Sequence, residues 1–593
     1  MSIEKLKNKY SKEIESTKAI LDRQKKKTYF YVVSKLLSAV ALLPILYLVY
    51  KNDADRTILM IILISLIVCY MALSFWDSKH MTFIQHLKDR IRICENEIKY
   101  LNGDYSPFRN GNDYVNSEHE FSYDLDIFGE SSFFHRINRT ITGIGEKSLA
   151  EKFISLPDTS AEISENSDSI SELKDMYEWR MTFLSQEFID YKPLRSINVK
   201  LSSFIVFVSK VLVGVTMTAL VMGILQIIPL GIFFLLAITQ FFISMVYLKS
   251  VSKVGLQSDK IQKTFDGYSN ILKKMQMQEF ESDKINGIKR ILFSGEKSSL
   301  KSFRELSRLL NLIDQRGTAV MYLLLNSLFM IDIYLVDRFN KWNNSYSSHF
   351  DSWMNCIGEM DALVSLATYS FNTPGAVKAQ LMESNSSYVM EAEDIFHPFL
   401  VLKSPVANSF QLERRGVAII TGANMAGKST FLRTLGVNYI LANIGVPVCA
   451  KSFRFTIMSL FSSMRTSDSL AKDVSYFNAE LLRIKKLLLH VQKSKYTFII
   501  LDEILKGTNS KDKLQGSVMF LKALEQYNIS CVIATHDLEL AKLEEASSDG
   551  MYKNYCFEIE LSENIKYSYK ITRGIAKNMN ATYLLSNILS DTL

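Results

Sequence analysis

The sequence has 593 residues, which is too many for a single hydrophobic core, so several domains are expected. Hydrophobic residues make up 48% of the chain, which indicates local apolar blocks in a largely soluble frame and excludes a protein built mainly of membrane-spanning helices. The net charge of +7 is modest, and six scattered cysteines without a C-x-x-C pair exclude a zinc cluster and a dense disulfide framework.

Two apolar runs follow a charged leader at residues 1–27. They extend over residues 28–50 and 57–76, with a short polar segment between them. Each run is long enough to cross about 30 Å of hydrocarbon as a helix. Residues 28–77 are therefore predicted to form a transmembrane hairpin, in which Lys35 reaches back to the lipid headgroups. A cleaved signal peptide is the alternative for the first run.

The leader and the segment after the hairpin, residues 78–120, carry apolar side chains at intervals of three and four. These residues are Ile3, Leu6, Tyr10, Ile14 and Leu21 before the hairpin, and Ile84, Leu87, Ile91, Cys94, Ile98 and Leu101 after it. The spacing predicts a short antiparallel coiled coil that extends the hairpin. The alternative is two independent amphipathic helices on the membrane surface. Both flanks are rich in lysine and arginine, which favours a cytoplasmic location.

A second apolar block covers residues 201–250 and is broken by the turn signal of Pro229 and Gly231. It predicts a second transmembrane hairpin, so the chain is expected to cross the membrane about four times and to keep its soluble segments in the cytoplasm. A shorter run at residues 320–331 is interrupted by Asn326. Its length predicts a buried core helix there.

A phosphate-binding loop, GANMAGKST, lies between a predicted strand and a predicted helix. Its backbone N–H groups and the helix dipole suit phosphate groups. Lys428 is expected to reach the β- and γ-phosphates of ATP, and the Ser429 hydroxyl to ligate Mg²⁺. The predicted ATP-binding residues are Gly422, Ala423, Asn424, Met425, Ala426, Gly427, Lys428, Ser429 and Thr430.

Polar residues also follow two further apolar strands. Asp502 and Glu503 follow residues 496–501. Asp502 is expected to hold Mg²⁺ through water, and Glu503 to polarise the attacking water as general base. A solvated strand end is the alternative for an isolated Asp–Glu pair. His536 follows the strand at residues 530–534, where an imidazole can sense the γ-phosphate, although a lone histidine is usually structural.

Ser475 begins a predicted amphipathic helix between these motifs, and a serine at that place is ordinarily an N-cap. In ATPases of the ABC superfamily, such a serine caps a helix that faces the γ-phosphate bound by the partner subunit. If this applies, Ser475 acts in trans and hydrolysis requires a homodimer.

The motifs resemble those of the MutS mismatch-repair family. Residues 421–433 are similar to its phosphate loop, residues 502–508 to its acidic strand and following loop, and residues 534–540 to its switch-histidine segment. Weaker similarity extends the resemblance over residues 121–200 and 346–590.

The resemblance implies a multi-domain protein, with an α-helical core and lever region and a C-terminal α/β P-loop ATPase domain of the ABC type. The transmembrane hairpins are predicted from the apolar runs alone, and the second lies inside the expected lever region, which departs from the family. It also implies ATP and Mg²⁺ as cofactors, a homodimer formed through the ATPase domains, and an adenine wall at residues 396–398. The expected segments are the leader (1–27), hairpin 1 (28–77), the returning helix and linker (78–120), the core (121–200 and 346–390), hairpin 2 (201–250), the lever (251–345), the ATPase domain (391–575) and a tail (576–593).

The sequence also departs from the family. No N-terminal mismatch-reading domain is expected. The tripeptide Phe128-Gly129-Glu130 matches the Phe-x-Glu motif of that domain, but it lies at the start of the core, with no room for such a domain around it. The segment at residues 252–316 is basic and could contact DNA phosphates, but its interspersed acidic residues fit a solvated face equally well.

The function expected from these features is that of a membrane-anchored MutS-like ATPase coupled to mismatched or structured DNA, in repair or DNA metabolism. One alternative is an ATP-driven membrane switch that acts on a protein partner. An ABC exporter is the weakest alternative, because only four crossings are predicted and no Leu-Ser-Gly-Gly-Gln sequence occurs.

Overall fold

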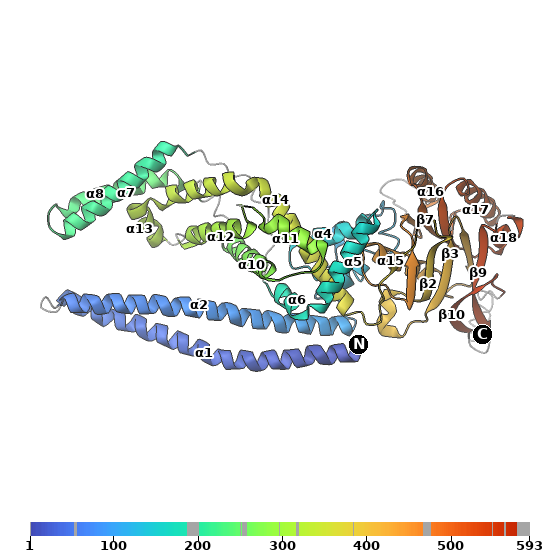
Figure 1. Ribbon diagram of the computed structural model, residues 1–593, viewed down its shortest axis with the longest axis horizontal. Coiled ribbons are helices and arrows are strands. Elements are labelled where there is room, and N and C mark those ends of the chain that lie inside the picture. The colour runs from blue at the N-terminus through green and yellow to red at the C-terminus, as the bar shows by residue number, and fades with distance from the viewer. Residues whose placement is uncertain are drawn as a thin grey trace, which may run out of the picture.

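A computed structural model describes residues 2–51, 56–186, 201–248, 251, 258–295, 297–315, 319–383, 385–465, 476–547, 550–561 and 565–577. The molecule is elongated, with two groups of apolar helices at one end and an α/β domain at the other (Figure 1). A helical body lies between these two ends.

Two very long helices form the N-terminal part, α1 (Ile3–Lys51) and α2 (Arg56–Leu101). They run antiparallel to each other beside the helical body (Figure 1). Apolar side chains from both helices are buried together at two places, which include Leu6, Tyr10, Cys94 and Leu101 in one cluster and Leu21, Ile84, Leu87 and Ile91 in the other. The coiled-coil pairing predicted from the heptad spacing is therefore confirmed.

The far halves of α1 and α2 expose apolar side chains, such as Leu43 at 71% and Trp76 at 56%. Within the part of the chain that the structure describes, three helical segments are long and apolar enough to cross a membrane, namely Ile3–Ile45, Ile61–Leu101 and Ser203–Ile224. The ammonium of Lys35 forms a 2.5 Å ion pair with Asp77 on α2. This charge pair joins the two helices of the hairpin.

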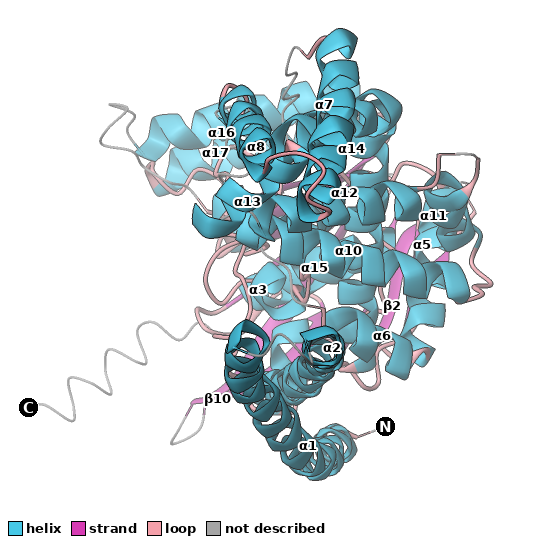
Figure 2. Cartoon of the chain, turned by 90° about the vertical axis from the view of Figure 1, so that its left-hand side faces the viewer, coloured by secondary structure: helices cyan, strands magenta, loops and turns pink. Residues whose placement is uncertain are grey.

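The second apolar hairpin is formed by α7 (Ser203–Ile224) and α8 (Leu230–Met245). Figure 2 looks onto the apolar end and shows this hairpin and the α1–α2 pair as two separate groups. Between α7 and α8, the buried side chain of Gln240 donates a hydrogen bond of 2.6 Å to Thr216.

The helix α13 (Ala319–Phe329) packs on α8 and beside α7. The prediction of a buried core helix for this segment is wrong, because several of its large apolar side chains are exposed. These are Met321, Leu323, Leu324 and Phe329. The physical reason is that a helix with apolar residues on all faces is equally suited to a protein interior and to a lipid environment, so its composition does not distinguish them.

The helical body is built around α14 (Ile331–Phe371), which packs against α4, α5, α11 and α12. The helix α14 passes without a break through residue 345, where the lever is expected to meet the core. The other helices of this part are α3 (Phe133–Ile137), α4 (Gly143–Ile154), α5 (Ser160–Asp175), α6 (Tyr177–Leu184), α10 (Ser258–Met277), α11 (Asp283–Phe293) and α12 (Ser299–Gln315).

Close packing of α4 on α14 depends on two glycines. A Cβ atom at Gly145 would lie 2.1 Å from the Asp361 carboxylate, and one at Gly358 would lie 2.5 Å from Ile144. The buried Asp361 carboxylate accepts hydrogen bonds from the backbone N–H groups of Ile141 and Thr142, while burial raises its pKa to about 6. The start of α4 is thus fixed to the centre of the body.

The C-terminal domain has the predicted α/β architecture. Its main sheet has the order β10-β9-β4-β8-β7-β6, in which all neighbouring strands are parallel except β9 and β10. The strands are β4 (Val417–Gly422), β6 (Ser459–Ser463), β7 (Thr497–Asp502), β8 (Ile529–Ala534), β9 (Tyr552–Leu561) and β10 (Ile565–Arg573). The helices are α15 (Lys428–Asn443), α16 (Tyr476–Lys493), α17 (Ser510–Leu524) and α18 (Leu543–Ala546).

A smaller sheet of order β1-β5-β2-β3 covers one side of the domain, with strands β1 (Gln380–Leu381), β2 (Tyr388–Ile395), β3 (Asn408–Glu413) and β5 (Ser452–Phe455). The domain therefore begins before the predicted boundary at residue 391. The central strands β4, β7 and β8 are buried on both faces, as expected for a parallel sheet. Their carboxyl ends share one edge, where ligands bind in sheets of this type.

Candidate functional site

The predicted phosphate loop connects β4 to α15. Gly422 and Gly427 have φ angles of +149° and +109°, and a Cβ atom at Gly422 would lie 2.8 Å from the backbone oxygen of Phe557. Met425, with φ of +64°, is a third residue with positive φ in this loop. The loop therefore needs glycine at both ends, and it turns its backbone toward the N-terminus of α15, where phosphate binds well.

Lys428 is buried beneath this loop. Its ammonium donates to the backbone oxygens of Gly422 at 2.7 Å and Ala423 at 2.9 Å. Burial lowers the pKa of Lys428 to about 8, although Asp502 and Glu503 favour its charged form. Its nitrogen also lies 3.4 Å from Nδ1 of His536. Lys428 and His536, which were predicted from separate motifs, are thus neighbours.

The acidic pair lies where β7 ends. Asp502 is its last residue and pairs in register with Ala534 of β8. Glu503 has a φ of +63°, and its N–H donates to the Ala534 oxygen at 2.9 Å. The Glu503 carboxylate forms an ion pair with Lys513 of α17. Burial raises the pKa of Glu503, but Lys513 outweighs burial, so the pKa lies below its usual value.

His536 follows β8 directly. Burial lowers its pKa, and the nearby Lys428 lowers it further, while the Glu503 carboxylate acts in the opposite direction. The imidazole is therefore kept neutral beside Lys428 at physiological pH. A neutral ring can accept a hydrogen bond at one nitrogen and donate at the other.

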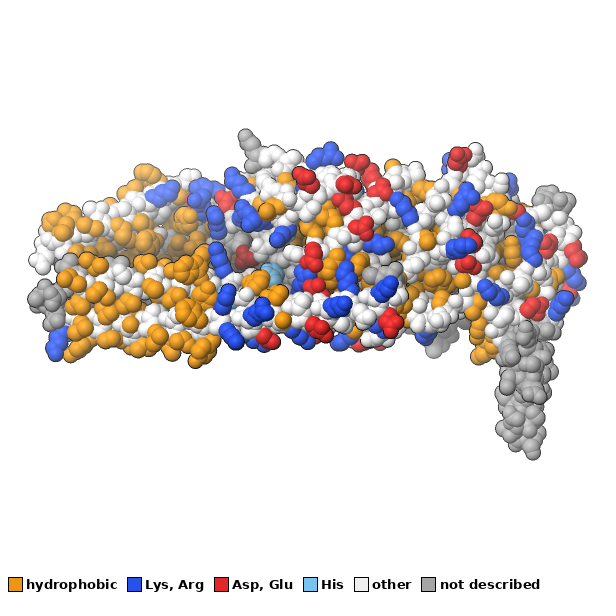
Figure 3. Space-filling view, turned by 60° about the horizontal axis from the view of Figure 1, so that its bottom comes forward, with side chains coloured by type: hydrophobic (Ala, Val, Ile, Leu, Met, Phe, Trp, Pro, Cys, Tyr) orange, Lys and Arg blue, Asp and Glu red, His pale blue; other side chains and the backbone are white. Residues whose placement is uncertain are grey.

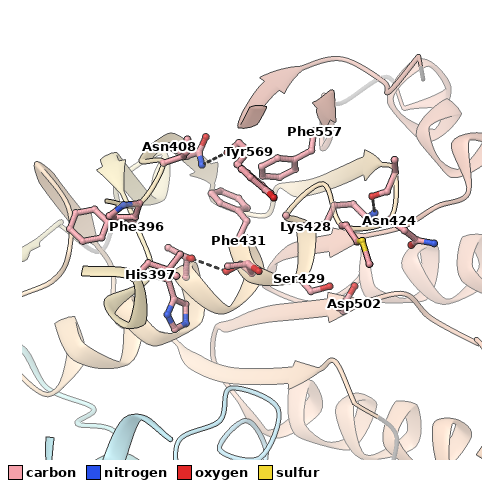
Figure 4. Close-up of a pocket in the computed structure, with 18 of the residues that line it drawn as sticks. Phe396, His397, Asn408, Asn424, Lys428, Ser429, Phe431, Asp502, Phe557 and Tyr569 are labelled. Atoms are coloured by element: carbon pink, nitrogen blue, oxygen red, sulfur yellow. Dashed lines mark hydrogen bonds between the residues drawn. The ribbon is translucent and has the colours of Figure 1, made fainter. Parts of the chain in front are cut away.

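These groups line one cavity of about 720 Å³, a size suited to a nucleotide. Figure 4 shows Lys428, Ser429 and Asp502 in one part of this pocket and Phe396 and His397 in another part. Residues 396–398 were predicted as an adenine wall, and two of them line the cavity. Burial lowers the pKa of His397 to about 3, so its ring is neutral.

Several lining residues were not predicted as site residues, and Asn408, Phe431, Phe557 and Tyr569 are among them (Figure 4). The Asn408 side chain donates to the backbone oxygen of Tyr569 at 3.0 Å and so joins β3 to β10 across the pocket. Asn408, Phe557 and Tyr569 come from the strands β3, β9 and β10, whereas Phe431 lies on α15 directly after the phosphate loop. The place of Phe431 beside that loop could have indicated it, and the aromatic character of Phe557 and Tyr569 is the one signal that these two residues offer.

The polar groups of the pocket fit Mg²⁺. Ser429 supplies a hydroxyl and Asp502 a carboxylate, which are hard oxygen ligands. Mg²⁺ is commonly held by one or two protein oxygens, with water and phosphate completing its shell. Over the described ranges, no group of three His, Cys, Asp or Glu residues forms a metal cluster, so a site of this sparse kind is the one that the residues fit.

Ser475 lies outside the described residues. The helix expected after it is present as α16, which begins at Tyr476. On this helix, the Glu480 carboxylate accepts hydrogen bonds of 3.0 Å from the backbone N–H groups of both Lys506 and Gly507. Glu480 is 7% exposed, and it was not predicted as a site residue. It joins α16 to the loop that follows Glu503.

The basic segment considered for DNA has a mixed character. Lys284 forms an ion pair of 2.7 Å with Glu359, and Lys289 donates to the backbone oxygen of Gln278. Both lysines therefore support the helical body. Phe128 of the Phe-Gly-Glu tripeptide packs against Tyr114 and Phe134, with ring centroids 5.7 and 5.2 Å apart.

Comparison with known proteins agrees with this geometry. Residues 418–584 match the family described as MutS domain V. The chain is 35% identical over 227 residues to the DNA mismatch repair protein MutS of Aquifex pyrophilus, which is 37% of this chain and 26% of that protein. It is 31% identical over 226 residues to the Persephonella marina protein of the same name, or 37% of this chain and 25% of the relative.

A longer match, 26% identical over 347 residues, links the chain to the DNA mismatch repair protein MutS of Leptospira interrogans. This match covers 57% of the chain and 38% of the relative, so the chain spans about a quarter to two fifths of the length of these relatives. The matched region contains the phosphate loop, the acidic pair and His536. The C-terminal part of this protein therefore matches the ATPase domain of the MutS family, and this domain implies ATP hydrolysis.

Proposed function

We propose that this protein is a membrane-anchored ATPase that closes as a homodimer around ATP and couples hydrolysis to DNA. The single observation that carries the proposal is the convergence of Lys428, Ser429, Asp502, Glu503 and His536 on one nucleotide-sized cavity. Each comes from the end of a strand or the start of a helix in the ATPase domain.

The roles follow from the chemistry of these side chains. Lys428 contacts the β- and γ-phosphates, and residues 422–430 donate backbone hydrogen bonds to them. Ser429 and Asp502 hold Mg²⁺, which neutralises phosphate charge when bound. Glu503 takes the proton of the attacking water, and His536 senses the γ-phosphate from its place beside Lys428.

Action as a dimer is supported by the open phosphate side of the pocket. Met425 in the loop is 79% exposed, and Ser429 next to the buried Lys428 is also exposed. A second subunit would cover this surface and bring its own Ser475 to the γ-phosphate. Water-excluding closure of this kind strengthens every electrostatic interaction in a site.

Membrane anchoring is supported by the apolar helices. The α1–α2 pair and the α7–α8 hairpin extend to the same end of the molecule, far from the ATPase domain (Figure 1). Figure 3 shows hydrophobic side chains covering that end and lysine and arginine gathered where the apolar surface stops. This is the distribution expected for a cytoplasmic protein body beside a bilayer.

DNA is the coupled ligand suggested by the names of the relatives, which are DNA mismatch repair proteins. The second candidate is a membrane switch that acts on a protein partner. It is favoured by α14, which runs without interruption from the apolar helices to the body near the ATPase domain (Figure 1). ATPase rates with no DNA, homoduplex, mismatched and branched DNA separate the two. A rate that does not respond to any DNA contradicts the first candidate.

Two substitutions test the site. Lys428→Ala should abolish ATP binding or turnover, because the phosphates lose their buried cation. Glu503→Gln should still bind ATP and accumulate a closed dimer with slow hydrolysis, because only proton transfer is lost. Nucleotide binding, steady-state turnover and size-exclusion chromatography in detergent measure these effects. Parental turnover by Glu503→Gln contradicts the assignment of the base.

A further inference from the structure

The helix α13 runs along α8 in the opposite direction. The ring of Tyr322 lies 5.9 Å from that of Phe241 near the end of α8, whereas Leu328 packs with Phe233 and Ala237 near its start. Because α8 leads away from the tip of its hairpin, α13 leads back toward that tip. The next helix, α14, then returns to the helical body (Figure 1).

The chain reverses direction at Met330, which is buried and has a φ of +47°. Asn326 stabilises this turn from the inside. Its side-chain oxygen accepts from the N–H of Asp332 at 3.0 Å, and its side-chain nitrogen donates to the Asp332 carboxylate at 3.3 Å. The backbone N–H of Met330 donates to the backbone oxygen of Asn326 at 3.2 Å.

This internal bonding is what a turn in hydrocarbon requires, because lipid offers no partners to backbone groups. Asn326 and Asp332 are both fully buried, so the polar groups of the turn face the protein. The side chains that α13 presents outward are apolar, and they include Leu323 at 52% and Phe329 at 47% exposure. A water-facing helix would carry polar groups on that surface.

The first turns of α14 show what lies at the edge of this apolar surface. Tyr334 is 42% exposed, and its hydroxyl accepts a hydrogen bond of 3.2 Å from Arg338. On the other hairpin, Lys79 lies 4.3 Å from the ring of Phe75 in a similar pairing of aromatic and cationic side chains. Such pairs are typical of the boundary between hydrocarbon and headgroups.

From these contacts we infer that α13 is a re-entrant membrane helix, which enters the bilayer beside α7 and α8 and whose outer face contacts lipid acyl chains. Its 11 residues span about 17 Å, roughly half of the hydrocarbon thickness, so it enters and returns without crossing. This inference rests on the proposed membrane anchoring. It adds that the membrane part connects directly to α14, the central helix of the body.

The test uses site-specific quenching by lipids. Cys69 is the one exposed cysteine of the chain, so Cys69→Ser gives a background for labelling. Leu323→Cys reports on α13, Leu235→Cys on the lipid-facing side of α8, and Lys341→Cys on the exposed surface of α14. Each is labelled with an environment-sensitive thiol probe and reconstituted in phosphatidylcholine vesicles with or without spin-labelled phosphatidylcholine. ATPase activity verifies that each variant is folded.

The inference expects the probe at residue 323 to be quenched as strongly as the probe at residue 235, with no quenching at residue 341. Quenching at residue 235 without quenching at residue 323 overturns the re-entrant helix and leaves the anchoring proposal standing. If the probes at residues 235 and 323 are both unquenched after reconstitution with the spin-labelled vesicles, membrane anchoring itself is overturned.

Discussion

Glu503 lines the nucleotide pocket and forms an ion pair with Lys513, which lowers the pKa of this proposed base. Burial alone would raise the pKa of Glu503, and Lys513 reverses this effect. In Lys513→Met, the pKa of Glu503 should therefore rise. Because the base must be ionised to act, the acid limb of the kcat–pH profile should move to higher pH.

The matched control for this prediction is Lys511→Met, since Lys511 is exposed on the same helix. Its pH profile should remain parental. Stopped assays from about pH 4.5 to 9 determine both profiles. An unchanged acid limb in Lys513→Met would show that the pair does not set the protonation of the base.

The residues that sequence predicted in this pocket share one property, which is a fixed place in a local motif. Lys428 and Ser429 stand in the phosphate loop, and Asp502 and His536 follow apolar strands. Asn408 and Lys513 stand in no such motif. Asn408 reaches the pocket from β3 and Lys513 reaches Glu503 from α17, in both cases only through tertiary structure. Their roles therefore depend on strand order and helix packing, which one sequence does not specify.

At the scale of elements, α16 and the loop after β7 act as one unit through Glu480. Its carboxylate accepts two backbone hydrogen bonds, from Lys506 and Gly507, and Lys506 lines the nucleotide pocket. A hydrogen bond to a charged group contributes about 1.5–3 kcal/mol. Losing part of this support should misplace the loop beside Glu503 without removing any group that contacts ATP.

Glu480→Ala should accordingly lower kcat by about tenfold or more while nucleotide affinity changes little. Glu545→Ala on the exposed surface of α18 is the control and should behave as the parent. Equilibrium binding of a fluorescent nucleotide and steady-state turnover separate the two effects. A parallel loss of affinity and kcat would indicate general damage to the domain and contradict the positioning role.

Helix α14 shows why element boundaries were harder to predict than the elements. The segment after Trp342 is rich in asparagine and serine, which are weak helix formers, so local propensity gives little support to a continuous helix there. In the structure, the Trp342 indole donates a hydrogen bond of 3.0 Å to the Ser302 oxygen on α12, and the helix continues. Tertiary packing thus overrides local propensity.

At the scale of the whole molecule, a short acidic segment joins the helical body to the ATPase domain. Asp126 forms ion pairs with Arg433 of α15 at 2.6 Å and with Arg465 at 2.5 Å. Asp124, which is buried, accepts a hydrogen bond of 3.2 Å from Arg483 of α16. The body therefore contacts both α15, the helix after the phosphate loop, and α16.

A second connection fastens the α1–α2 pair to the body. Glu97 on α2 accepts hydrogen bonds of 3.1 and 3.0 Å from Arg139, and both side chains are 2% exposed. Asn372, at the end of α14, donates to Glu97 at 2.7 Å and accepts from Tyr10 of α1 at 2.8 Å. One buried network thus joins the first helix pair, the body and the C-terminal end of α14.

This network predicts a large effect from one substitution. Glu97→Ala leaves the Arg139 charge buried without its counter-ion, which typically costs about 3–5 kcal/mol. The apparent unfolding midpoint in detergent, at a fixed scan rate, should fall by several degrees. The control Glu151→Ala removes only an exposed ion pair with Lys147, so it should shift the unfolding midpoint little. Equal midpoints for the two variants would mean that the α1–α2 pair is held to the body by apolar packing, and that movement of these helices is not transmitted through Glu97.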